Sequence, residues 1–265
     1  MPKTVLVTGA TKNTGYAIAE RFAKEKWNVV ITSRDQASAE EAAQRLMKEY
    51  PDSVAMGIEM DVADVTAIRV AFGKVKERFG TMDAYVSNAA HLGVGLSVLN
   101  TTEEDWDAVM NANARGSFFG AQEAVKLMKN GGALLFISSV HANKSIPGRI
   151  CYTASKAAIG GMMRGMAVEL GCMGIRANCL LAGAIRSDRW DSLSDEEIDT
   201  RRGRWPAGRE SYPEEIAEAA YFLCTAETVT GIEMPVDSGI STCLLGYNKN
   251  WMQNDPNNVK YWEKK

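Results

Sequence analysis

Histidine is scarce in this sequence, and cysteine occurs without the spacing that metal sites need. Only two histidines, His91 and His141, are present in 265 residues, and they form no H-x-x-x-H pair. The five cysteines form no C-x-x-C pair and no cluster with histidine. Structural zinc sites need such ligand clusters, so we predict no metal centre and expect the cysteines to be buried, reduced thiols.

Positive charge is not in excess, and long hydrophobic runs are missing. Lys and Arg number 30 against 33 Asp and Glu, which gives a formal net charge of −3. Because nucleic-acid binders carry a basic patch, we expect no nucleic-acid partner. No apolar run approaches the roughly 20 residues of a membrane helix. Lys3 leads into a strand-like segment rather than a signal-peptide core, so we expect no membrane partner and a cytoplasmic location.

The sequence does contain a regular alternation of short apolar segments with segments of helical period. Seven strand-like segments occur at residues 3–8, 28–33, 53–60, 82–87, 133–139, 175–181 and 232–237. The main helical segments lie between them, at residues 14–26, 37–49, 65–79, 103–127, 151–171 and 213–224. Strands that are apolar throughout are buried on both faces, and helical connections make their sheet parallel. The pattern predicts the α/β class: a single-domain, Rossmann-type, doubly wound parallel sheet of about seven strands flanked by helices.

We expect residues 1–239 to form this single domain, and two segments fall outside the alternation. The first is 184–212, in which Ser194 and Glu197 form a capping box that opens a short helix. The second is a C-terminal extension, 240–265. Three further helix starts are marked by a capping box of Thr101 with Glu104, by Asp64 as a cap and by Pro213 at a first helical position.

The first strand runs into a glycine-containing turn, T-G-A-T-K-N-T-G at residues 8–15, and then into a helix. Small residues allow the sharp turn, and the helix N-terminus has unpaired N–H groups and a partial positive charge. Such an end suits a pyrophosphate. The position after the first strand makes this turn more specific than a glycine-rich turn elsewhere.

A second motif is Y-T-A-S-K, in which Tyr152 and Lys156 lie four residues apart. Ser139 ends the preceding strand, thirteen residues before Tyr152. Residues four apart share one helix face, so the ammonium can lie near the phenol and lower its pKa. Tyr152 is therefore a candidate acid/base group.

Taken together, the turn 8–15, Asn88-Ala89, Asn113, Ser139, Tyr152 and Lys156 occur in the order and spacing of the short-chain dehydrogenase/reductase family. The chain resembles this family over about residues 3–239. The resemblance implies an NAD(P)(H)-dependent oxidoreductase that interconverts a ketone or aldehyde and an alcohol by hydride transfer.

The resemblance also implies roles for four catalytic residues. Tyr152 would be the acid/base, and Ser139 would hydrogen-bond the substrate oxygen. Lys156 would hold the nicotinamide ribose and lower the pKa of Tyr152. Asn113 would help to hold a water that relays protons to Lys156, whereas the neighbouring Asn111 fits the family spacing less well.

Cofactor contacts are implied in the same way. Asp61 and Val62 would lie at the adenine, Asn88 and Ala89 at the adenosine ribose, and Ile185 and Ser187 at the carboxamide. The remaining positions are those of the turn and the second strand end, with the catalytic pair: Gly9, Lys12, Asn13, Thr14, Gly15, Ser33, Arg34, Tyr152 and Lys156. Asn13 replaces a family glycine, and Asn tolerates a left-handed backbone better than most residues.

The choice between NADP(H) and NAD(H) depends on charge at the end of the second strand. Ser33 stands where an acidic residue would grip a ribose 2′-hydroxyl, and Arg34 follows it. With Lys12 in the turn, two cations can reach a 2′-phosphate, which favours NADP(H). Asp35 leaves NAD(H) possible, and Arg34 has the alternative role of stacking on the adenine.

Substrate contacts are suggested around these motifs. In the family, the segment 184–212 is a lid over the substrate, and its Trp190 and Trp205 are candidate pocket walls. His91, His141 and Arg149 flank the catalytic elements in sequence. The substrate class stays open between a sugar or polyol, a ketoacyl group, and a cyclic ketone or alcohol.

Two other functions are compatible with a dinucleotide-binding fold. A dinucleotide-sensing regulatory protein would retain the fold without turnover, but it has no need of all four catalytic residues. A sugar-nucleotide epimerase would have a shorter glycine spacing and a larger substrate domain.

By analogy with the family we expect a homotetramer or a homodimer. We also expect the aromatic residues of the extension 240–265 to dock on the lid or on a neighbouring subunit.

Overall fold

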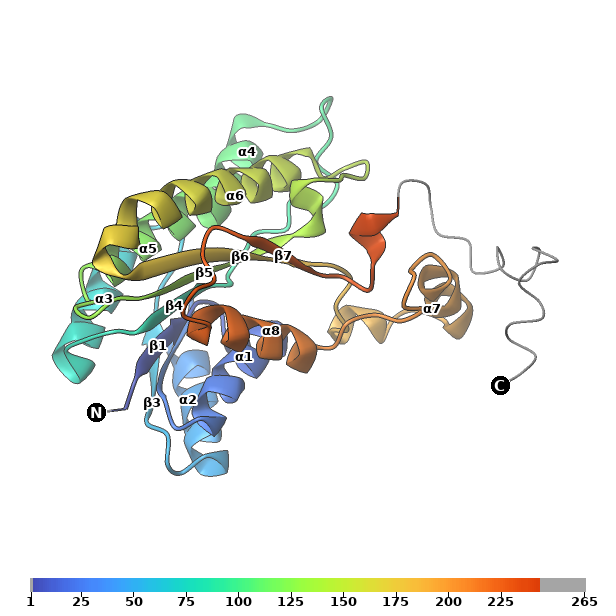
Figure 1. The fold of residues 1–265 in the computed structure, drawn as a ribbon. Helices are drawn as coiled ribbons and strands as arrows, with labels where there is room; N and C mark the ends of the chain where they lie inside the picture. The colour runs from blue at the N-terminus through green and yellow to red at the C-terminus, as the bar shows by residue number, and fades with distance from the viewer. Residues whose placement is uncertain (1, 244–265) are drawn as a thin grey trace.

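In the computed structural model, residues 2–243 are described, and they contain one seven-stranded parallel sheet (Figure 1). The strand order is β3-β2-β1-β4-β5-β6-β7. The strands are β1 (Thr4–Val7), β2 (Asn28–Ser33), β3 (Ala55–Glu59), β4 (Ala84–Ser87), β5 (Gly132–Ser139), β6 (Ile175–Ala182) and β7 (Glu233–Val236). The predicted fold class is confirmed. Most of the extension 240–265 lies outside the described residues.

Helices cover both faces of the sheet, with α1, α2 and α8 on one side and α3 to α6 on the other (Figure 1). The helices are α1 (Asn13–Lys24), α2 (Gln36–Glu49), α3 (Val65–Phe79), α4 (Glu103–Met110), α5 (Gly116–Val125), α6 (Ile150–Leu170), α7 (Asp195–Arg202) and α8 (Pro213–Thr225). Within the described part of the chain, no helix is both long and apolar enough to cross a membrane.

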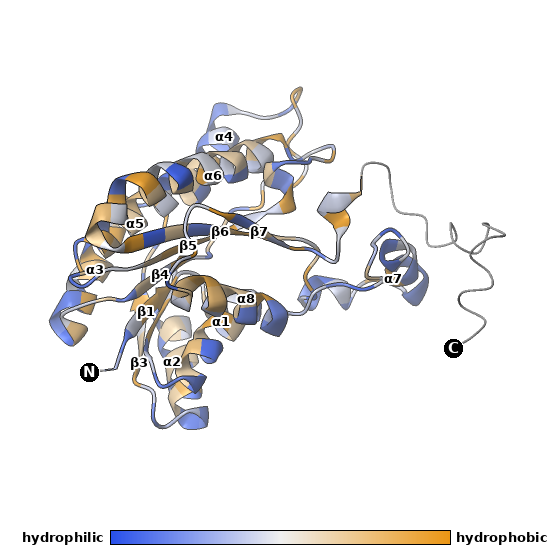
Figure 2. Ribbon diagram, in the orientation of Figure 1, coloured by the Kyte–Doolittle hydropathy of each residue, from blue (hydrophilic) through white to orange (hydrophobic). Residues whose placement is uncertain are grey.

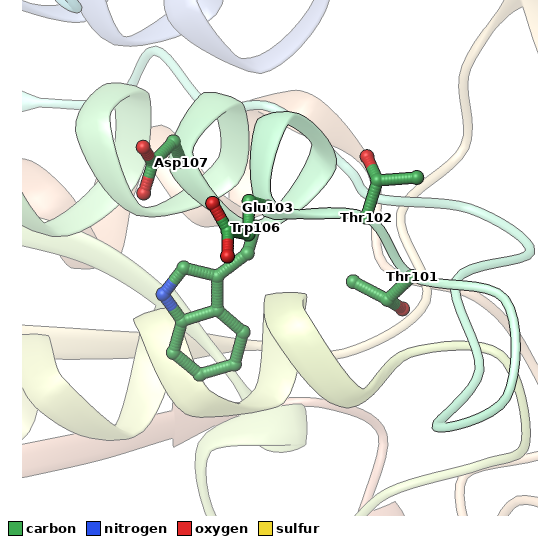
Figure 3. Close-up of a pocket in the computed structure, with 5 residues that line it drawn as sticks. All are labelled: Thr101, Thr102, Glu103, Trp106 and Asp107. Atoms are coloured by element: carbon green, nitrogen blue, oxygen red, sulfur yellow. The ribbon is translucent and has the colours of Figure 1, made fainter.

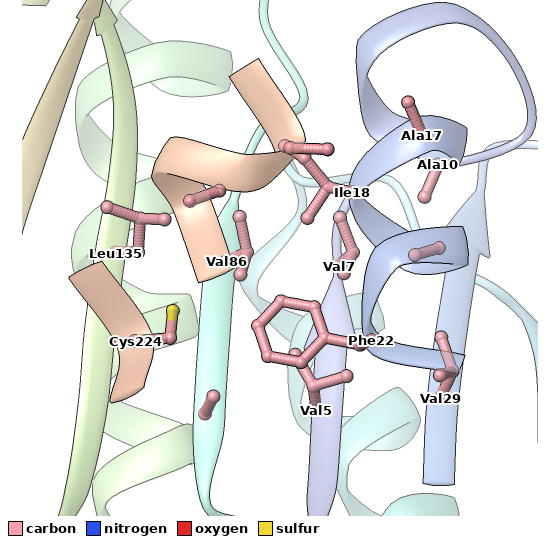
Figure 4. Close-up of a cluster of buried hydrophobic side chains, with 14 of the residues drawn as sticks. Val5, Val7, Ala10, Ala17, Ile18, Phe22, Val29, Val86, Leu135 and Cys224 are labelled. Atoms are coloured by element: carbon pink, nitrogen blue, oxygen red, sulfur yellow. The ribbon is translucent and has the colours of Figure 1, made fainter. Parts of the chain in front are cut away.

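Two hydrophobic cores result, one on each face of the sheet. Val5 and Val7 of β1 pack with Ile18 and Phe22 of α1 (Figure 4), whereas Leu6 belongs to the core on the opposite face. This alternation explains why the strand is apolar at every position. α7 is instead hydrophilic along its length and lies away from both cores (Figure 2).

The chain adds β2 and β3 on one side of β1 and then returns to place β4 on its other side. At such a reversal the connections leave in opposite directions, which opens a crevice at the carboxyl ends of the strands. The residues implicated by the sequence follow these strand ends, so the topology gathers them at one edge.

Most predicted helix starts are confirmed. Asp64 caps α3, Pro213 begins α8, and Ser194 and Glu197 form the capping box of α7. The capping box of Thr101 with Glu104 is wrong, because Thr102 and Asp105 form it instead. The hydroxyl of Thr101 donates to the carbonyl of Ser97 at 2.6 Å and so belongs to the preceding turn.

The single helix expected over residues 103–127 is interrupted by a π-helical turn, Asn111–Arg115, which separates α4 from α5. There the backbone N–H of Gly116 donates to the carbonyl of Asn111, five residues earlier. Such turns insert a residue and occur often at functional sites. The turn contains Asn113, one of the predicted catalytic residues.

The expectation for cysteine holds only in part. Cys151, Cys179 and Cys224 are buried free thiols, whereas Cys172 is exposed and Cys243 is partly exposed. Cys172 lies in a short turn after α6, where the chain reaches the surface, so no core covers it.

Candidate active site

The glycine-containing turn lies at the carboxyl end of β1, where the end of β4 approaches it. Gly9 and Asn13 have left-handed backbones, with φ of 61° and 49°. A Cβ added to Gly15 would lie 2.4 Å from the carbonyl oxygen of Gly9 and 2.6 Å from Nδ2 of Asn88. No side chain fits at Gly15, so glycine there allows the helix to start this close to the strand.

Hydrogen bonds lock the ends of β1 and β4 together. The Thr8 hydroxyl accepts from the backbone N–H groups of Asn88 and Ala89, at 2.9 Å each. The Asn88 side chain donates in return to the carbonyls of Thr8 and Gly9, at 2.9 and 3.1 Å. Asn88 and Ala89 therefore lie beside the turn.

The N-terminus of α1 fits the phosphates of a dinucleotide. Lys12 is the N-cap residue, and its side chain makes no capping hydrogen bond. The first-turn N–H groups, including those of Thr14 and Gly15, therefore have no side-chain cap, and they stand at the positive end of the helix dipole.

The end of β2 carries an exposed arginine, and the carboxylate beside it is already hydrogen-bonded. Arg34 is exposed. Asp35 is the N-cap of α2, and its carboxylate accepts from the backbone N–H of Ser38 at 2.7 Å. Ser33 accepts from the Asp35 N–H at 3.3 Å. The one acidic residue next to Arg34 is therefore turned to its own helix.

Two further cations lie near the turn, and the sequence revealed only one of them. Nζ of Lys12 lies 3.4 Å from a carboxylate oxygen of Asp188, in the lid segment, and both side chains are largely exposed. Arg45 reaches across from α2, donates to the carbonyl of Thr11 at 2.9 Å and stacks 4.1 Å from the ring centroid of Tyr16. Nothing in the sequence pattern indicated that Arg45, well inside α2, would reach the turn.

The remaining cofactor candidates lie at the same edge of the sheet. Asp61 and Val62 follow β3, and the Asp61 carboxylate accepts from the N–H of Ala63 at 2.9 Å. Ile185 and Ser187 follow β6, and Ser187 begins a short helical turn without a side-chain capping hydrogen bond. Their contacts with adenine and carboxamide stay predictions.

Three of the four catalytic candidates come together at the ends of β5 and α6. Tyr152 is 9% exposed, and the Ser139 side chain lies near enough to its hydroxyl to act on its pKa. Nζ of Lys156 lies 5.6 Å from the centroid of the Tyr152 ring and donates to the carbonyl of Ile137 at 2.7 Å. The one-turn spacing on α6 thus places phenol and ammonium side by side.

Burial controls the protonation of this pair. Burial raises the pKa of Tyr152, and the hydrogen bond from Ser139 and the charges of Arg149 and Arg189 oppose that rise. Burial also lowers the pKa of Lys156 to about 8. Lys156 is not among the main causes that act on the pKa of Tyr152, so its predicted lowering of that pKa stays a prediction. The Lys156 ammonium is directed to the carbonyl of Ile137 rather than to the phenol.

Asn113 is fully buried in the π-helical turn and joins two segments of the site. Its side-chain oxygen accepts from the N–H of His91 at 2.7 Å. Its side-chain nitrogen donates to the His91 carbonyl and to the Ser155 hydroxyl, at 2.9 Å each. Ser155 in turn donates to the Tyr152 carbonyl. Asn113 therefore connects the His91 backbone to α6, and its roles in positioning and in a water relay stay predictions.

Two of the substrate candidates lie against Tyr152. The His141 ring centroid is 5.9 Å from that of Tyr152, and the Arg149 guanidinium carbon is 5.8 Å from it. Burial lowers the pKa of His141, and the charge of Arg149 adds to this effect. The His91 backbone binds Asn113, and its ring accepts from the N–H of Gly93 at 3.2 Å, so a substrate contact of His91 stays a prediction.

Trp190 and Trp205 pack on each other inside the lid segment. Their ring centroids are 6.0 Å apart, and they are only 6% and 9% exposed. Trp190 also donates to the carbonyl of Ile185 at 2.9 Å. Both rings therefore form a small core that holds the lid together, and a pocket-lining role stays a prediction.

Hydrogen bonds hold the lid segment together and connect it to the residues just before the C-terminal extension. Arg202 makes two hydrogen bonds of 2.8 Å to the buried Glu210 carboxylate, which holds the pKa of Glu210 at about 2. Ala207 donates to the carbonyl of Ser238. Lys144 donates to the carbonyl of Ser241 at 2.6 Å. The extension thus begins between the lid and the loop that follows β5.

A shallow hollow of about 310 Å³ lies at the start of α4 (Figure 3). It is lined by Thr101, Thr102, Glu103, Trp106 and Asp107. None of the predicted site residues lines it. Within residues 2–243, no group of His, Cys, Asp or Glu side chains is arranged to hold a metal ion.

Comparison with known proteins agrees with this geometry. Residues 9–241 match the profile of a protein family described as enoyl-(acyl carrier protein) reductase. A solved short-chain dehydrogenase/reductase from Serratia marcescens, in a double-mutant form, superposes with a TM-score of 0.82 at 29% identity, covering 90% of this chain and 98% of that one. The chain belongs to the short-chain dehydrogenase/reductase family and is an oxidoreductase of that class.

The individual relatives differ in the substrates that their names give. Glucose 1-dehydrogenase 2 of Bacillus subtilis is 35% identical, over 90% of this chain and 95% of its own length. A 3alpha-hydroxysteroid dehydrogenase of Mediterraneibacter gnavus is 32% identical, over 89% of this chain and 95% of its own length. This chain is similar to both, and a sugar and a steroid have little shape in common.

Proposed function

We propose that this protein is an NAD(P)(H)-dependent oxidoreductase that interconverts a ketone or aldehyde and an alcohol. The observation that carries the proposal is the convergence of Ser139, Tyr152 and Lys156 at the sheet edge that also bears the turn 8–15. A bound nicotinamide would supply or accept the hydride.

The residues of the chain would then handle the proton and the oxygen. The Tyr152 hydroxyl donates its proton to the substrate oxygen during reduction and takes it back during oxidation. Ser139, whose side chain acts on the same phenol, donates to the same oxygen as negative charge develops on it. Lys156, with a pKa of about 8, is mostly protonated near neutral pH and can bind the ribose hydroxyls.

NADP(H) is the cofactor that the charges favour. Arg34 forms no ion pair within the described residues, and the Asp35 carboxylate is occupied by the N–H of Ser38. A guanidinium without a partner at the end of β2 suits a 2′-phosphate. Lys12 supports this choice only if it leaves Asp188 when the cofactor binds.

The test is a screen by nicotinamide absorbance with both cofactors. The panel contains aldoses and polyols, β-keto thioesters, and cyclic ketones with their alcohols. Turnover with any of them, faster with NADPH than with NADH, supports the proposal. Arg34→Ala should weaken NADP(H) binding about tenfold and leave NAD(H) unchanged. Tight cofactor binding without turnover of any compound would favour a dinucleotide sensor.

A homotetramer or homodimer in the cytoplasm completes the proposal. Large apolar side chains are exposed on α4, α5 and α6, namely Trp106 at 43%, Phe118 at 39% and Val168 at 86%. Exposed apolar side chains on neighbouring helices favour an interface between copies. The relevant measurement is the mass in solution.

A further inference from the structure

Two arginines from distant parts of the chain carry charges that act on the phenol of Tyr152. Arg149 immediately precedes α6, and its guanidinium carbon lies 5.8 Å from the Tyr152 ring centroid. Arg189 belongs to the lid, and its charge acts on the same phenol. No carboxylate is among the main groups that act on it. The surroundings of the reacting oxygen are therefore positively charged.

Neither Arg149 nor Arg189 forms an ion pair within residues 2–243. The acids closest to Arg189 in sequence face elsewhere: Asp188 lies 3.4 Å from Lys12, and Asp191 lies 3.5 Å from Arg186. Three other arginines of the lid form ion pairs: Arg186 with Asp191 and Glu210, Arg202 with Glu210, and Arg209 with Glu215. Arg149 and Arg189 differ from these three, and among the described residues Arg201 and Arg204 share with them the lack of an ion pair.

Arg149 is held in place rather than free in solvent. Its side chain is partly buried and donates to the carbonyl of Leu92 at 2.7 Å. Its backbone carbonyl accepts from Thr153 at the start of α6, at 2.8 Å. A guanidinium has five N–H donors, and within the described residues the Leu92 carbonyl is the acceptor for one of them. A fixed guanidinium with free donors is suited to bind a carboxylate through two parallel hydrogen bonds.

We propose that the substrate is a keto acid or the corresponding hydroxy acid, whose carboxylate binds between Arg149 and Arg189 while its carbonyl meets Tyr152 and Ser139. This inference rests on the oxidoreductase function proposed above and narrows its substrate class. Since Arg149 belongs to the body and Arg189 to the lid, a carboxylate between them also ties the lid over the site. Burial keeps the pKa of His141 low, so this neighbour adds no third charge at neutral pH.

The test is a set of ketones with the carboxylate at increasing distance from the carbonyl: pyruvate, acetoacetate and levulinate, each paired with its uncharged methyl ester. We expect kcat/KM to favour the acid over its ester by about tenfold or more at one of these distances. Arg149→Met and Arg189→Met should bring that ratio close to one; any effect of these charges on Tyr152 applies to acid and ester alike and cancels in the ratio. Arg78→Met, which removes an exposed arginine from α3, should leave the ratio unchanged.

Calorimetry gives a second readout that needs no turnover. Levulinate and its methyl ester are titrated into the protein saturated with NADP⁺, where a ketone cannot be reduced. Tighter binding of the acid, lost in Arg149→Met, supports the inference. Equal binding of acid and ester, or faster turnover of the esters, overturns it and leaves the oxidoreductase function standing. Acid-selective binding with no turnover of any ketone or alcohol would instead contradict the oxidoreductase function and leave the carboxylate site.

Discussion

Tyr152→Phe removes one hydroxyl from the site and leaves the ring that packs beside His141 and Lys156. We expect turnover to fall by about 10² to 10⁴-fold, because the phenol supplies the proton in the proposed reaction. Cofactor affinity should change by less than about twofold, since the phenol contributes little of the binding energy. Steady-state kinetics with a cofactor titration measure both. Tyr50→Phe, a partly buried tyrosine of the opposite face, is the control, and full activity of Tyr152→Phe would refute the assigned role.

Lys156 gives the protein a pH-dependent stability whose sign follows from its burial. Burial lowers its pKa from 10.5 to about 8, so between pH 8 and pH 10.5 the unfolded chain holds a proton that the folded protein has released. The free energy of unfolding of the wild type, relative to Lys156→Met, should therefore rise with pH through this window. The rise should approach about 3 kcal/mol at the upper end.

Urea denaturation of both proteins at several pH values measures this difference. The exposed Lys74 of α3 provides the control, because Lys74→Met should give a difference that stays flat. If the free energy of unfolding of the wild type, relative to Lys156→Met, falls with rising pH, the folded protein instead stabilises the charged form of Lys156.

The sequence predicts residues of this site where the chemistry depends on local spacing. Tyr152 and Lys156 could be paired because one helical turn separates them, and Asn13 could be expected to take a left-handed backbone. Contacts across large sequence distances could not be predicted, such as Arg45 on the carbonyl of Thr11 or Lys12 on Asp188. Both contacts depend on how the helices and the lid pack in the folded protein, and the spacing of residues along the chain does not reveal that packing.

Among the structural elements, the π-helical turn Asn111–Arg115 provides a test of how Asn113 acts. Asn113→Ala removes three hydrogen bonds, two to the His91 backbone and a buried one to Ser155. We expect the free energy of unfolding to fall by about 2–4 kcal/mol. Asn111→Ala is the matched control, because its side chain makes no hydrogen bond within the described residues, and it should cost less than about 0.5 kcal/mol. Equal losses in the two variants would remove the distinction between these asparagines.

Activity separates positioning from simple stability in the same two variants. At a temperature where Asn113→Ala is folded, kcat should still fall, because Ser155 and the helix turn bearing Tyr152 lose a support. Circular dichroism shows whether the variant is folded. A folded variant with normal kcat would limit Asn113 to a structural role.

Element boundaries illustrate a second limit of prediction from sequence. Apolar residues recur at helical spacing throughout residues 103–127, so the sequence predicts one continuous helix. The π-helical turn arises there because Asn113 is fixed by partners in the loop at His91 and in α6, and these contacts form only in the folded chain. The capping residue shifted from Thr101 to Thr102 for a similar reason, since Ser97 binds the Thr101 hydroxyl.

At the scale of the whole molecule, the exposed apolar side chains of α4 to α6 lead to a prediction about assembly. Phe118→Glu places a charge on this surface and should reduce the mass in solution by a factor of about two, because burying an unpaired charge is costly. Light scattering measures the mass. Val70→Glu on α3, where the valine is 56% exposed, is the control and should leave the mass unchanged. A wild-type monomer would refute the proposed assembly outright.

The two ends of the lid lie side by side. The N–H of Arg186 donates to the carbonyl of Ser211, and the N–H of Ser211 donates to the carbonyl of Ala184, at 2.9 Å each. The segment between them therefore leaves the framework and returns to it at one place, without threading through the sheet. A segment of this kind can change in sequence and length while these two hydrogen bonds keep its ends in place. Substrate choice can then diverge through the lid, together with body residues such as Arg149, while Ser139 and Tyr152 keep their positions on the framework.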